Sequence, residues 1–107
     1  MSTLAITGGT GFVGSRLIAL AIEAGHKVRA LTRREQAERE RIAWIPGTLA
    51  NEPALARLAE GADAVIHVAG VVNAPSRAGF AGGNIEGTAN MLAAAAGAGV
   101  QRFVHVS

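Results

Sequence analysis

Several residue types that often define a protein's chemistry are missing or rare in this sequence. It contains no cysteine and no tyrosine, and its only lysine is Lys27. Without cysteine the chain can form no disulfide, bind no metal through thiolates and use no cysteine nucleophile, which fits a cytoplasmic location. We therefore name no metal site.

Aromatic residues are scarce too, and the charge is nearly balanced. Only 4% of the residues are aromatic, and the formal net charge is +2. Proteins that bind nucleic acids usually gather basic residues on one face or stack bases on aromatic side chains. The apolar stretches at 3–7 and 88–100 are too short to cross a bilayer. We expect neither a nucleic acid nor a membrane as a partner.

What the sequence does contain is a regular alternation of patterns. Half of its 107 residues are apolar, which is enough for the core of one soluble domain. Short β-type runs alternate with helical patterns, as is typical of βαβ units and a parallel sheet in an α/β fold. The expected strands cover residues 3–7, 27–31, 42–45, 64–68 and 102–106, and the expected helices cover residues 12–24, 51–60 and 84–98.

Local patterns add detail to these elements. The strand at 64–68 is expected to be buried on both faces, and Asn51 is expected to cap the helix that follows it. The charged segment 33–41 predicts a solvated turn or short helix, and the glycine-rich segment 70–83 predicts a long loop. The buried face of the first helix is expected to carry five apolar residues: Val13, Leu17, Leu20, Ala21 and Ala24.

A glycine-rich loop joins the first expected strand to the first expected helix. The segment TGGTGFVG contains G-x-G-x-x-G between a strand and a helix. Gly8 permits the tight turn, Gly11 leaves room for a pyrophosphate, and Gly14 lets the helix and the sheet pack closely. The N–H groups of the helix N-terminus, at Phe12 and Val13, would then face the phosphates.

This loop predicts a Rossmann-type fold over residues 1–107: a doubly wound parallel sheet of about five strands in the order 3-2-1-4-5, truncated before its second half is complete. A P-loop has similar glycine spacing. It requires Lys and then Ser or Thr after the last glycine, where this chain has Ser15 and Arg16. A glycine turn that binds no ligand remains the other alternative.

Two arginines follow the second expected strand. Arg33 and Arg34 stand close to the place where NAD-selective folds carry an acidic residue for the ribose 2′-hydroxyl. A guanidinium group can grip a 2′-phosphate through two hydrogen bonds, which favours NADP over NAD. The alternative is that both arginines belong to a solvated run of charges.

Together these segments resemble the short-chain dehydrogenase/reductase superfamily, in its extended or atypical branch, the NAD-dependent epimerase/dehydratase family. TGGTGFVG resembles the glycine loop of that branch, and Leu31-Thr32-Arg33 resembles its NADP-preferring members. H-V-A-G at 67–70, N-x-x-G-T-x-N at 84–90 and R-F-V-H-V-S at 102–107 resemble three later segments of the same branch. The likeness spans the whole chain.

The resemblance implies roles for several of these residues. Ala69 and Gly70 would lie along the cofactor ribose, and Asn84 would lie near the active site, although Asn84 could instead be a helix cap. The last strand would lead to the catalytic serine or threonine, at Ser107 or just beyond the end of the chain. For His67 we favour packing and hydrogen bonding within the sheet over catalysis.

The chain departs from the family pattern in two ways. Thr48-Leu49 stands where many relatives have Asp-Leu, so the adenine would be held by Thr48 and by the backbone of Leu49. The family's catalytic Tyr and the Lys four residues after it are not in this chain. We therefore expect the chain alone to be inactive.

Two hypotheses follow. The first is the NADP-binding segment of a reductase, epimerase or dehydratase that transfers hydride at the nicotinamide and acts on a small molecule. The alternative is a non-catalytic NADP sensor or structural subunit with the same fold. Under the first hypothesis the edge of the last strand and one face of the sheet would be exposed, so we also expect self-association.

Overall fold

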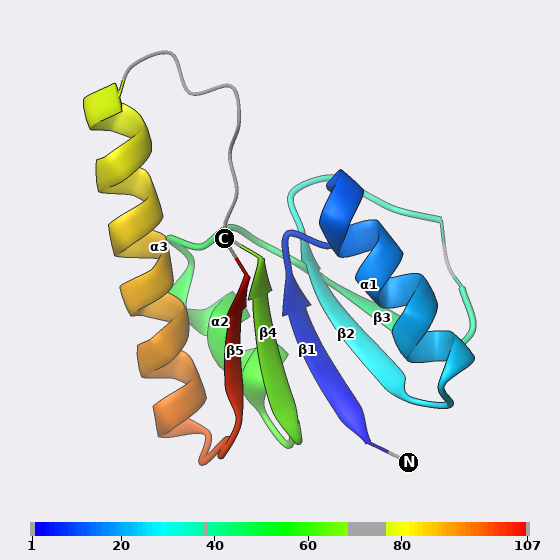
Figure 1. Ribbon diagram of the computed structural model, residues 1–107. Helices are drawn as coiled ribbons and strands as arrows, with labels where there is room; N and C mark the ends of the chain where they lie inside the picture. The colour runs from blue at the N-terminus through cyan, green and yellow to red at the C-terminus, as the bar shows by residue number, and fades with distance from the viewer. Residues whose placement is uncertain (1, 38, 69–76, 107) are drawn as a thin grey trace.

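The computed structural model shows an α/β fold with a single parallel sheet (Figure 1). It describes residues 2–37, 39–68 and 77–106, and within 77–85 it describes the backbone alone. The strands are β1 (Thr3–Thr7), β2 (Lys27–Thr32), β3 (Ile42–Pro46), β4 (Ala64–Val68) and β5 (Phe103–Val106), and the helices are α1 (Phe12–Glu23), α2 (Glu52–Ala59) and α3 (Arg77–Gly97). The strand order β3-β2-β1-β4-β5 confirms the predicted Rossmann-type sheet.

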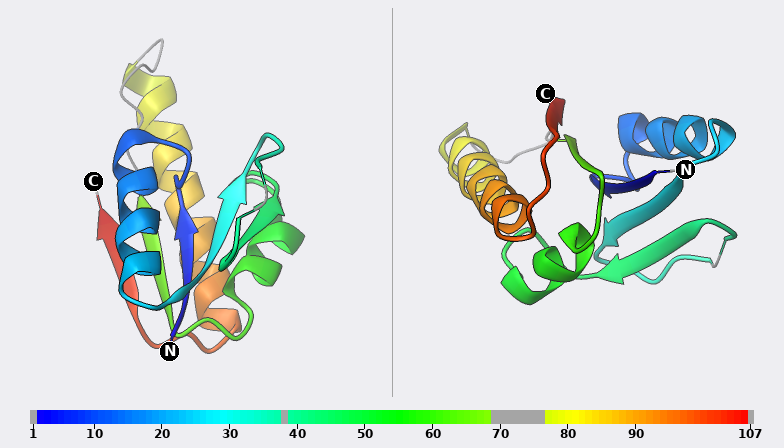
Figure 2. Two further views of the ribbon diagram at one scale, coloured as in Figure 1. Left: turned by 90° about the vertical axis from the view of Figure 1, so that its right-hand side faces the viewer. Right: turned by 90° about the horizontal axis from the view of Figure 1, so that it is seen from below.

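The helices form a layer on each face of the sheet. Figure 2 shows α1 on one face and α2 with α3 on the other. On the face of α2 and α3, Leu55, Leu58 and Met91 are fully buried against the sheet. On the face of α1, Ile18 packs against buried residues of β1 and β2, among them Ile6. Each βαβ unit therefore buries its apolar residues on its own side of the sheet.

The buried face of α1 differs from the expected one. The side chains that face the sheet are Ile18 and Ala21, in line with Gly14, while Val13 and Leu20 are 47% and 45% exposed. Of the five expected residues, Ala21 is buried and Leu17 is partly buried, whereas Val13, Leu20 and Ala24 are exposed, so the buried face is rotated about the helix axis relative to the expected one. The rotation arises because Gly14 lies directly against the backbone of Gly8, and this contact sets which side of α1 faces the strands.

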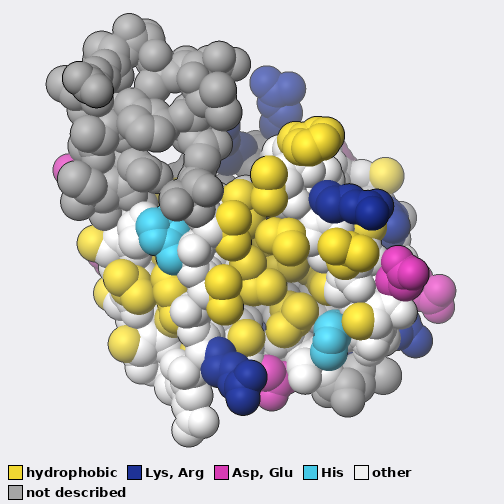
Figure 3. All heavy atoms as spheres, viewed as in Figure 1, with side chains coloured by type: hydrophobic (Ala, Val, Ile, Leu, Met, Phe, Trp, Pro, Cys, Tyr) yellow, Lys and Arg dark blue, Asp and Glu magenta, His cyan; other side chains and the backbone are white. Residues whose placement is uncertain are grey.

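The two faces of β4 also differ, which corrects the expectation of burial on both. Val65 and His67 point toward α2 and α3 and are fully buried, whereas Ile66 is partly exposed on the opposite face. That opposite face is covered by α1 only over β1 and β2, so Val104 of β5 is half exposed. Apolar side chains gather there in Figure 3. Self-association through this face stays a prediction.

Helix α3 begins earlier than the sequence predicted. Its first residue is Arg77, so residues 77–83 are helical and not part of a loop. Glycine weakens a helix without forbidding it, and here the helix continues into the segment that packs on the sheet. The charged segment 33–41 forms no helix where it is described. No helix in the described part of the chain is long and apolar enough to cross a membrane.

Candidate functional site

Three loops with predicted binding residues meet at one edge of the sheet. They follow β1, β2 and β3, and the carboxyl ends of parallel strands point the same way. The loop after β1 carries the glycines, the loop after β2 begins with Arg33, and the loop after β3 contains Thr48. The N-terminal ends of α1 and α2 lie at the same edge, where the strand arrows end in Figure 1.

Close packing against backbone accounts for Gly8 and Gly14 of the first loop, and a third glycine, Gly9, lies against the end of a side chain. Gly8 has φ +70°, and a Cβ there would lie 2.6 Å from the carbonyl oxygen of Val68. A Cβ on Gly9 would lie 2.7 Å from Cδ1 of Ile18, and one on Gly14 would lie 1.9 Å from the carbonyl oxygen of Gly8. These glycines allow β1, β4 and α1 to approach one another closely.

Gly11 is different, because no described part of the protein crowds it. A Cβ there would meet one atom within 4 Å, the carbonyl oxygen of Gly8 at 3.5 Å, which is an ordinary contact. Its φ of −81° and ψ of 177° suit any residue. Its N–H donates to the carbonyl of Gly8 over 3.1 Å, which closes the turn. Packing alone therefore does not explain why this position is a glycine.

The N-terminus of α1 is open. Gly11 is its N-cap residue and offers no side chain to cap it, none of the described side chains caps the helix, and its first turn contains no acidic residue. The side chain of Phe12 is 93% exposed and that of Val13 about half exposed, so neither is used in the core. The first N–H groups of a helix have no partners within it and carry a partial positive charge. This end of α1 is suited to an anion.

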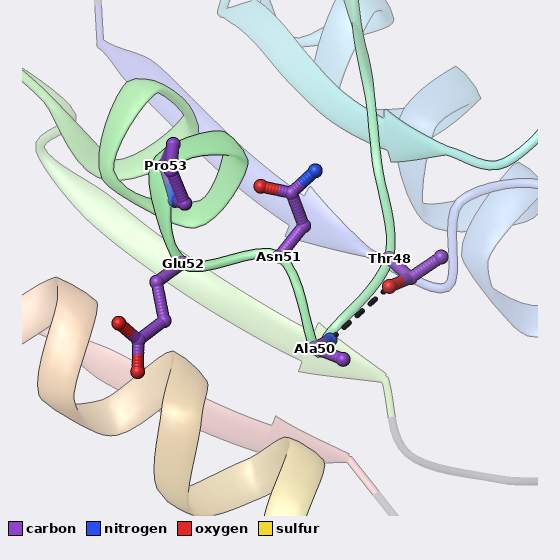
Figure 4. A pocket seen from close by; sticks show the side chains of 5 residues that line it. All are labelled: Thr48, Ala50, Asn51, Glu52 and Pro53. Carbon is purple, nitrogen blue, oxygen red and sulfur yellow. Dashed lines mark hydrogen bonds between the residues drawn. The ribbon is translucent and has the colours of Figure 1, made fainter.

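The N-terminus of α2 is closed by its own residues. Oδ1 of Asn51 accepts a hydrogen bond from the N–H of Ala54 over 3.1 Å, which confirms the predicted cap. Glu52 places a carboxylate in the first turn. Thr48 is exposed, and its Oγ1 accepts a hydrogen bond from the N–H of Ala50 over 3.2 Å, as the dashed line in Figure 4 shows. A hollow of about 470 Å³ is lined by Thr48, Ala50, Asn51, Glu52 and Pro53.

Leu49 is held by α3. Nδ2 of Asn90 donates to the carbonyl oxygen of Leu49 over 2.8 Å. Gly87 brings the helix close, since a Cβ at this position would lie 2.8 Å from Cδ1 of Leu49. The carbonyl of Leu49 is thus engaged by the protein itself. Sequence reasoning gave no role to Gly87 or Asn90, although both belong to the N-x-x-G-T-x-N segment that it singled out.

Arg33 and Arg34 are exposed and stand just after β2, at the same edge as the glycine loop. The turn is held by Thr32, whose Oγ1 accepts from the N–H of Arg34 over 3.2 Å and donates to the carbonyl of Arg34 over 2.5 Å. Strands β1 and β2 are neighbours in the sheet. Arg33 follows β2, so it lies in the loop next to the glycine loop, which follows β1. Both arginines carry their charge in solvent at this edge.

His67 is fully buried at the carboxyl end of β4. Its Nδ1 lies 2.6 Å from Oγ1 of Thr7 on β1, and its Nε2 lies 3.0 Å from Oγ1 of Thr88 on α3. The pKa of His67 is lowered, first by burial and then by the positive charge that His105 can carry, whose ring stacks on it at 5.4 Å. The histidine is therefore packed and hydrogen-bonded, as expected.

The remaining predicted site residues are not placed in detail. Ala69, Gly70 and Ser107 lie outside the described residues. Asn84 lies within α3, where the backbone alone is described, and not at its first residue, so its interpretation as a helix cap is wrong. Its position near the active site stays a prediction.

Comparison with known proteins identifies the family. The model of the NAD dependent epimerase/dehydratase family matches residues 4–107. The chain belongs to this family. Its fold is that of NAD(P)-dependent oxidoreductases, and the glycine loop, the segment after β2 and the loop after β3 all lie within the matched region.

Similar proteins from this fold have more than one role. The chain is 39% identical over 108 residues to a ceramide reductase of Caulobacter vibrioides. This match covers 97% of the chain and 34% of the reductase. A crystal structure of a short-chain dehydrogenase/reductase superfamily protein from Agrobacterium tumefaciens with bound NAD has 33% identity and a TM-score of 0.80, covering 96% of this chain and 31% of that one. A crystal structure of Nmra, a negative transcriptional regulator, has 26% identity and a TM-score of 0.78. This match covers 97% of the present chain and 33% of Nmra.

This epimerase/dehydratase-family chain spans about a third of the length of the curated relatives it matches. The matches cover 95% and 97% of this chain, so they include the carboxyl edge of its sheet. Within the described residues, that edge brings together an open helix N-terminus, two exposed arginines and a hollow beside Thr48.

Proposed function

We propose that this chain is the NADP-binding segment of an oxidoreductase of the NAD dependent epimerase/dehydratase family. The observation that carries the proposal is the open N-terminus of α1, with a glycine at position 11 that packing among the described residues does not require. A Cβ at Gly11 would occupy space beside the first N–H groups of the helix. We propose that the cofactor pyrophosphate occupies this space.

The pyrophosphate carries negative charge, and the N-terminus of α1 offers unpaired N–H donors and the positive end of the helix dipole. In our proposal the backbones of Phe12 and Val13 donate to it, while Gly8 and Gly14 hold the loop in shape. The first turn of α1 adds no carboxylate to repel it. The bound NAD of the Agrobacterium tumefaciens relative supports a dinucleotide as the ligand class.

Arg33 is our candidate for the residue that selects NADP. The guanidinium group stands after β2, and it can form two hydrogen bonds with a 2′-phosphate. Arg34 adds a second positive charge at the same turn. An acidic residue at this position would repel the phosphate and favour NAD.

The rest of the cofactor would extend along the same edge. We propose that the adenine lies near Thr48 and Leu49, in or beside the hollow of Figure 4. By resemblance to the family, Ala69 and Gly70 would line a ribose, and Asn84 and Ser107 would stand toward the nicotinamide. The carbonyl oxygen of Leu49 accepts a hydrogen bond from Asn90, so we assign the exposed Thr48 side chain and the backbone N–H of Leu49 to the adenine.

When bound, the nicotinamide would supply the hydride chemistry, and the chain would orient the cofactor and exclude water from it. The substrate class is a small molecule. Because the chain contains no tyrosine, we expect it to bind the cofactor without turning over a substrate. The similarity to Nmra keeps a second candidate open: a regulatory protein that holds a dinucleotide and transfers no hydride.

Calorimetric titration of the chain with NADPH, and separately with NADH, tests the proposal. We expect NADPH to bind more tightly, and Arg33→Ala to weaken NADPH by roughly 10- to 100-fold, the value of one or two charged hydrogen bonds. NADH binding should hardly change. Arg39→Ala is the matched control, because Arg39 is an exposed arginine of the same charged segment.

Each outcome has a distinct meaning. An equal loss of NADPH affinity in Arg33→Ala and Arg39→Ala would show that the NADP preference rests on overall charge and not on Arg33. Absence of binding by either nucleotide would contradict the proposed function.

A further inference from the structure

A chain of three polar side chains connects α3 to the end of β1. The imidazole of His67 lies at its centre, with Thr7 2.6 Å from Nδ1 and Thr88 3.0 Å from Nε2. His67 and Thr7 are almost completely buried, and Thr88 is partly buried. A buried polar chain with every imidazole nitrogen bonded is a rigid link between the elements that carry it.

Thr7, at one end of this row of three hydrogen-bonded side chains, lies at the start of the glycine loop. Thr7 is the last residue of β1 and pairs in register with His67 on β4. The next residue is Gly8, whose φ of +70° turns the chain out of the strand. Gly8 lies against Val68, the residue after His67, so closely that a Cβ would be 2.6 Å from the Val68 carbonyl oxygen. The hydrogen bond between Thr7 and His67 thus fixes the strand pair at the point where the loop begins.

Thr88, at the other end of the row, lies on the part of α3 that contacts the loop after β3. Thr88 lies between Gly87, which packs on Leu49, and Asn90, which donates to the carbonyl oxygen of Leu49 over 2.8 Å. One stretch of α3, residues 87–90, therefore touches both the loop after β3 and, through His67, the end of β1. The two loops are held at fixed positions relative to each other by the same helix.

We infer that His67 is a positioning residue for dinucleotide binding: through Thr7 and Thr88 it uses α3 to set the position of the glycine loop. The inference rests on the proposed function, because the loop is the part that we assign to the pyrophosphate. Both neutral tautomers of the ring satisfy the two bonds, since each threonine hydroxyl can donate or accept. The link therefore needs the two hydroxyls and does not depend on a charge on the ring.

Thr88 offers a matched pair of variants. Thr88→Val keeps the size and branching of the side chain and removes the hydroxyl, whereas Thr88→Ser keeps the hydroxyl and removes the methyl group. The first readout is amide hydrogen exchange in the chain without ligand. It compares the N–H of Gly11, bonded to Gly8 in the loop, with that of Leu55, bonded to Asn51 in α2.

We expect Thr88→Val to raise exchange at Gly11 by about fivefold relative to Leu55, since a lost neutral hydrogen bond is worth about 1 kcal/mol. Thr88→Ser should restore the wild-type ratio. Thr7→Val, which removes the other hydroxyl of the chain, should act in the same direction. A purely structural role would raise exchange at both amides alike, because general loss of stability opens α2 as well.

The second readout is calorimetric titration of the same variants with NADPH. We expect affinity to fall by about fivefold in Thr88→Val and to recover in Thr88→Ser. An unchanged Gly11-to-Leu55 exchange ratio in Thr88→Val and Thr7→Val would overturn the inference whatever the affinities. If the ratio rises and the wild-type chain binds no NADPH, the positioning of the loop stands and the proposed function fails.

Discussion

Helices α1 and α2 begin at the same edge of the sheet, yet their N-termini are built in opposite ways. The N-cap of α2 is Asn51, whose side chain bonds to the N–H of Ala54, and Glu52 adds a negative charge in the first turn. The N-cap of α1 is Gly11, with no side-chain cap and no acidic residue. One end satisfies an N–H donor with its own cap residue, and the other has no such cap among the described residues.

Under the proposed function, this difference marks the N-terminus of α1 as the end that binds the ligand. A capped N-terminus adds roughly 1 kcal/mol of stability, and a helix that lacks a cap forgoes it. At α1 the missing cap coincides with Gly11, which packing among the described residues does not require, beside Gly8 and Gly14, which lie too close to backbone atoms for a Cβ. The loop thus separates into residues that shape it and one residue that keeps it open.

The largest effect that we predict comes from filling the closest contact in that loop. Gly14→Ala would put a methyl group 1.9 Å from the carbonyl oxygen of Gly8, a backbone atom that cannot move aside cheaply. We expect a loss of at least about 3 kcal/mol in the free energy of unfolding, at the upper end for overpacking, measured by urea denaturation. Gly97→Ala is the control: it has no atom within 4 Å and should be neutral or slightly stabilising. Equal stability of the two variants would contradict this prediction.

The next effect comes from giving α1 the kind of N-terminus that α2 has. Gly11→Asp has room for its side chain, and its carboxylate would cap α1 and repel a pyrophosphate. We expect NADPH affinity to fall at least about a hundredfold, about 3 kcal/mol, by calorimetry. Thermal stability should stay equal or rise. A folded Gly11→Asp variant that binds NADPH like the wild type would show that the ligand lies elsewhere.

Removing the N-terminal cap of α2 should lower the stability of the protein and leave NADPH affinity unchanged. Asn51→Ala removes the cap of α2, whose bond to Ala54 measures 3.1 Å, and should cost about 1 kcal/mol of unfolding free energy. Asn51→Asp keeps an acceptor and should retain most of that stability. Denaturation curves measure the loss, and NADPH titration should show affinity within about twofold of the wild type. A larger loss of affinity would show that Asn51, which lines the hollow assigned to the adenine, takes part in the cofactor site.

The smallest effect is a dependence of stability on pH. Burial, aided by the charge of His105, lowers the pKa of His67 below its ordinary 6.5. As the pH falls below 6.5, the unfolded chain takes up a proton at this residue that the folded chain does not, so stability declines until the folded pKa is reached and is greatest above 6.5. Urea denaturation between about pH 5.5 and 7.5 measures the slope.

His67→Asn is the control for that slope. It keeps a polar group at the position and does not titrate, so its curve should be flatter than that of the wild type. Parallel curves would assign the pH dependence to other groups.

The sequence predicted the order of elements well because the alternation of β-type runs and helical patterns is a local signal. The glycine loop and the Asn51 cap were also predictable, since each rests on a few neighbouring residues. The buried face of α1 was not, because it depends on the contact between Gly14 and Gly8. The start of α3 was missed for a related reason: glycine-rich sequence lowers helix propensity without excluding a helix.

Hydrogen bonds between residues far apart in the sequence could not be predicted from the sequence alone. Thr7, His67 and Thr88 lie on three different elements, and their hydrogen bonds follow only from the way those elements pack. The same holds for the bond between Asn90 and Leu49. The motif segments did contain these residues, which indicates where to look and not what each side chain contacts.

The most direct test of the account is a nuclear magnetic resonance titration of the isotope-labelled chain with NADPH, following each backbone amide. We predict saturable shifts that are largest at the amides of residues 8–14, where Gly11 opens the N-terminus of α1. Saturable shifts that leave residues 8–14 unmoved, or no shifts at all, would contradict the claim that this loop holds the cofactor.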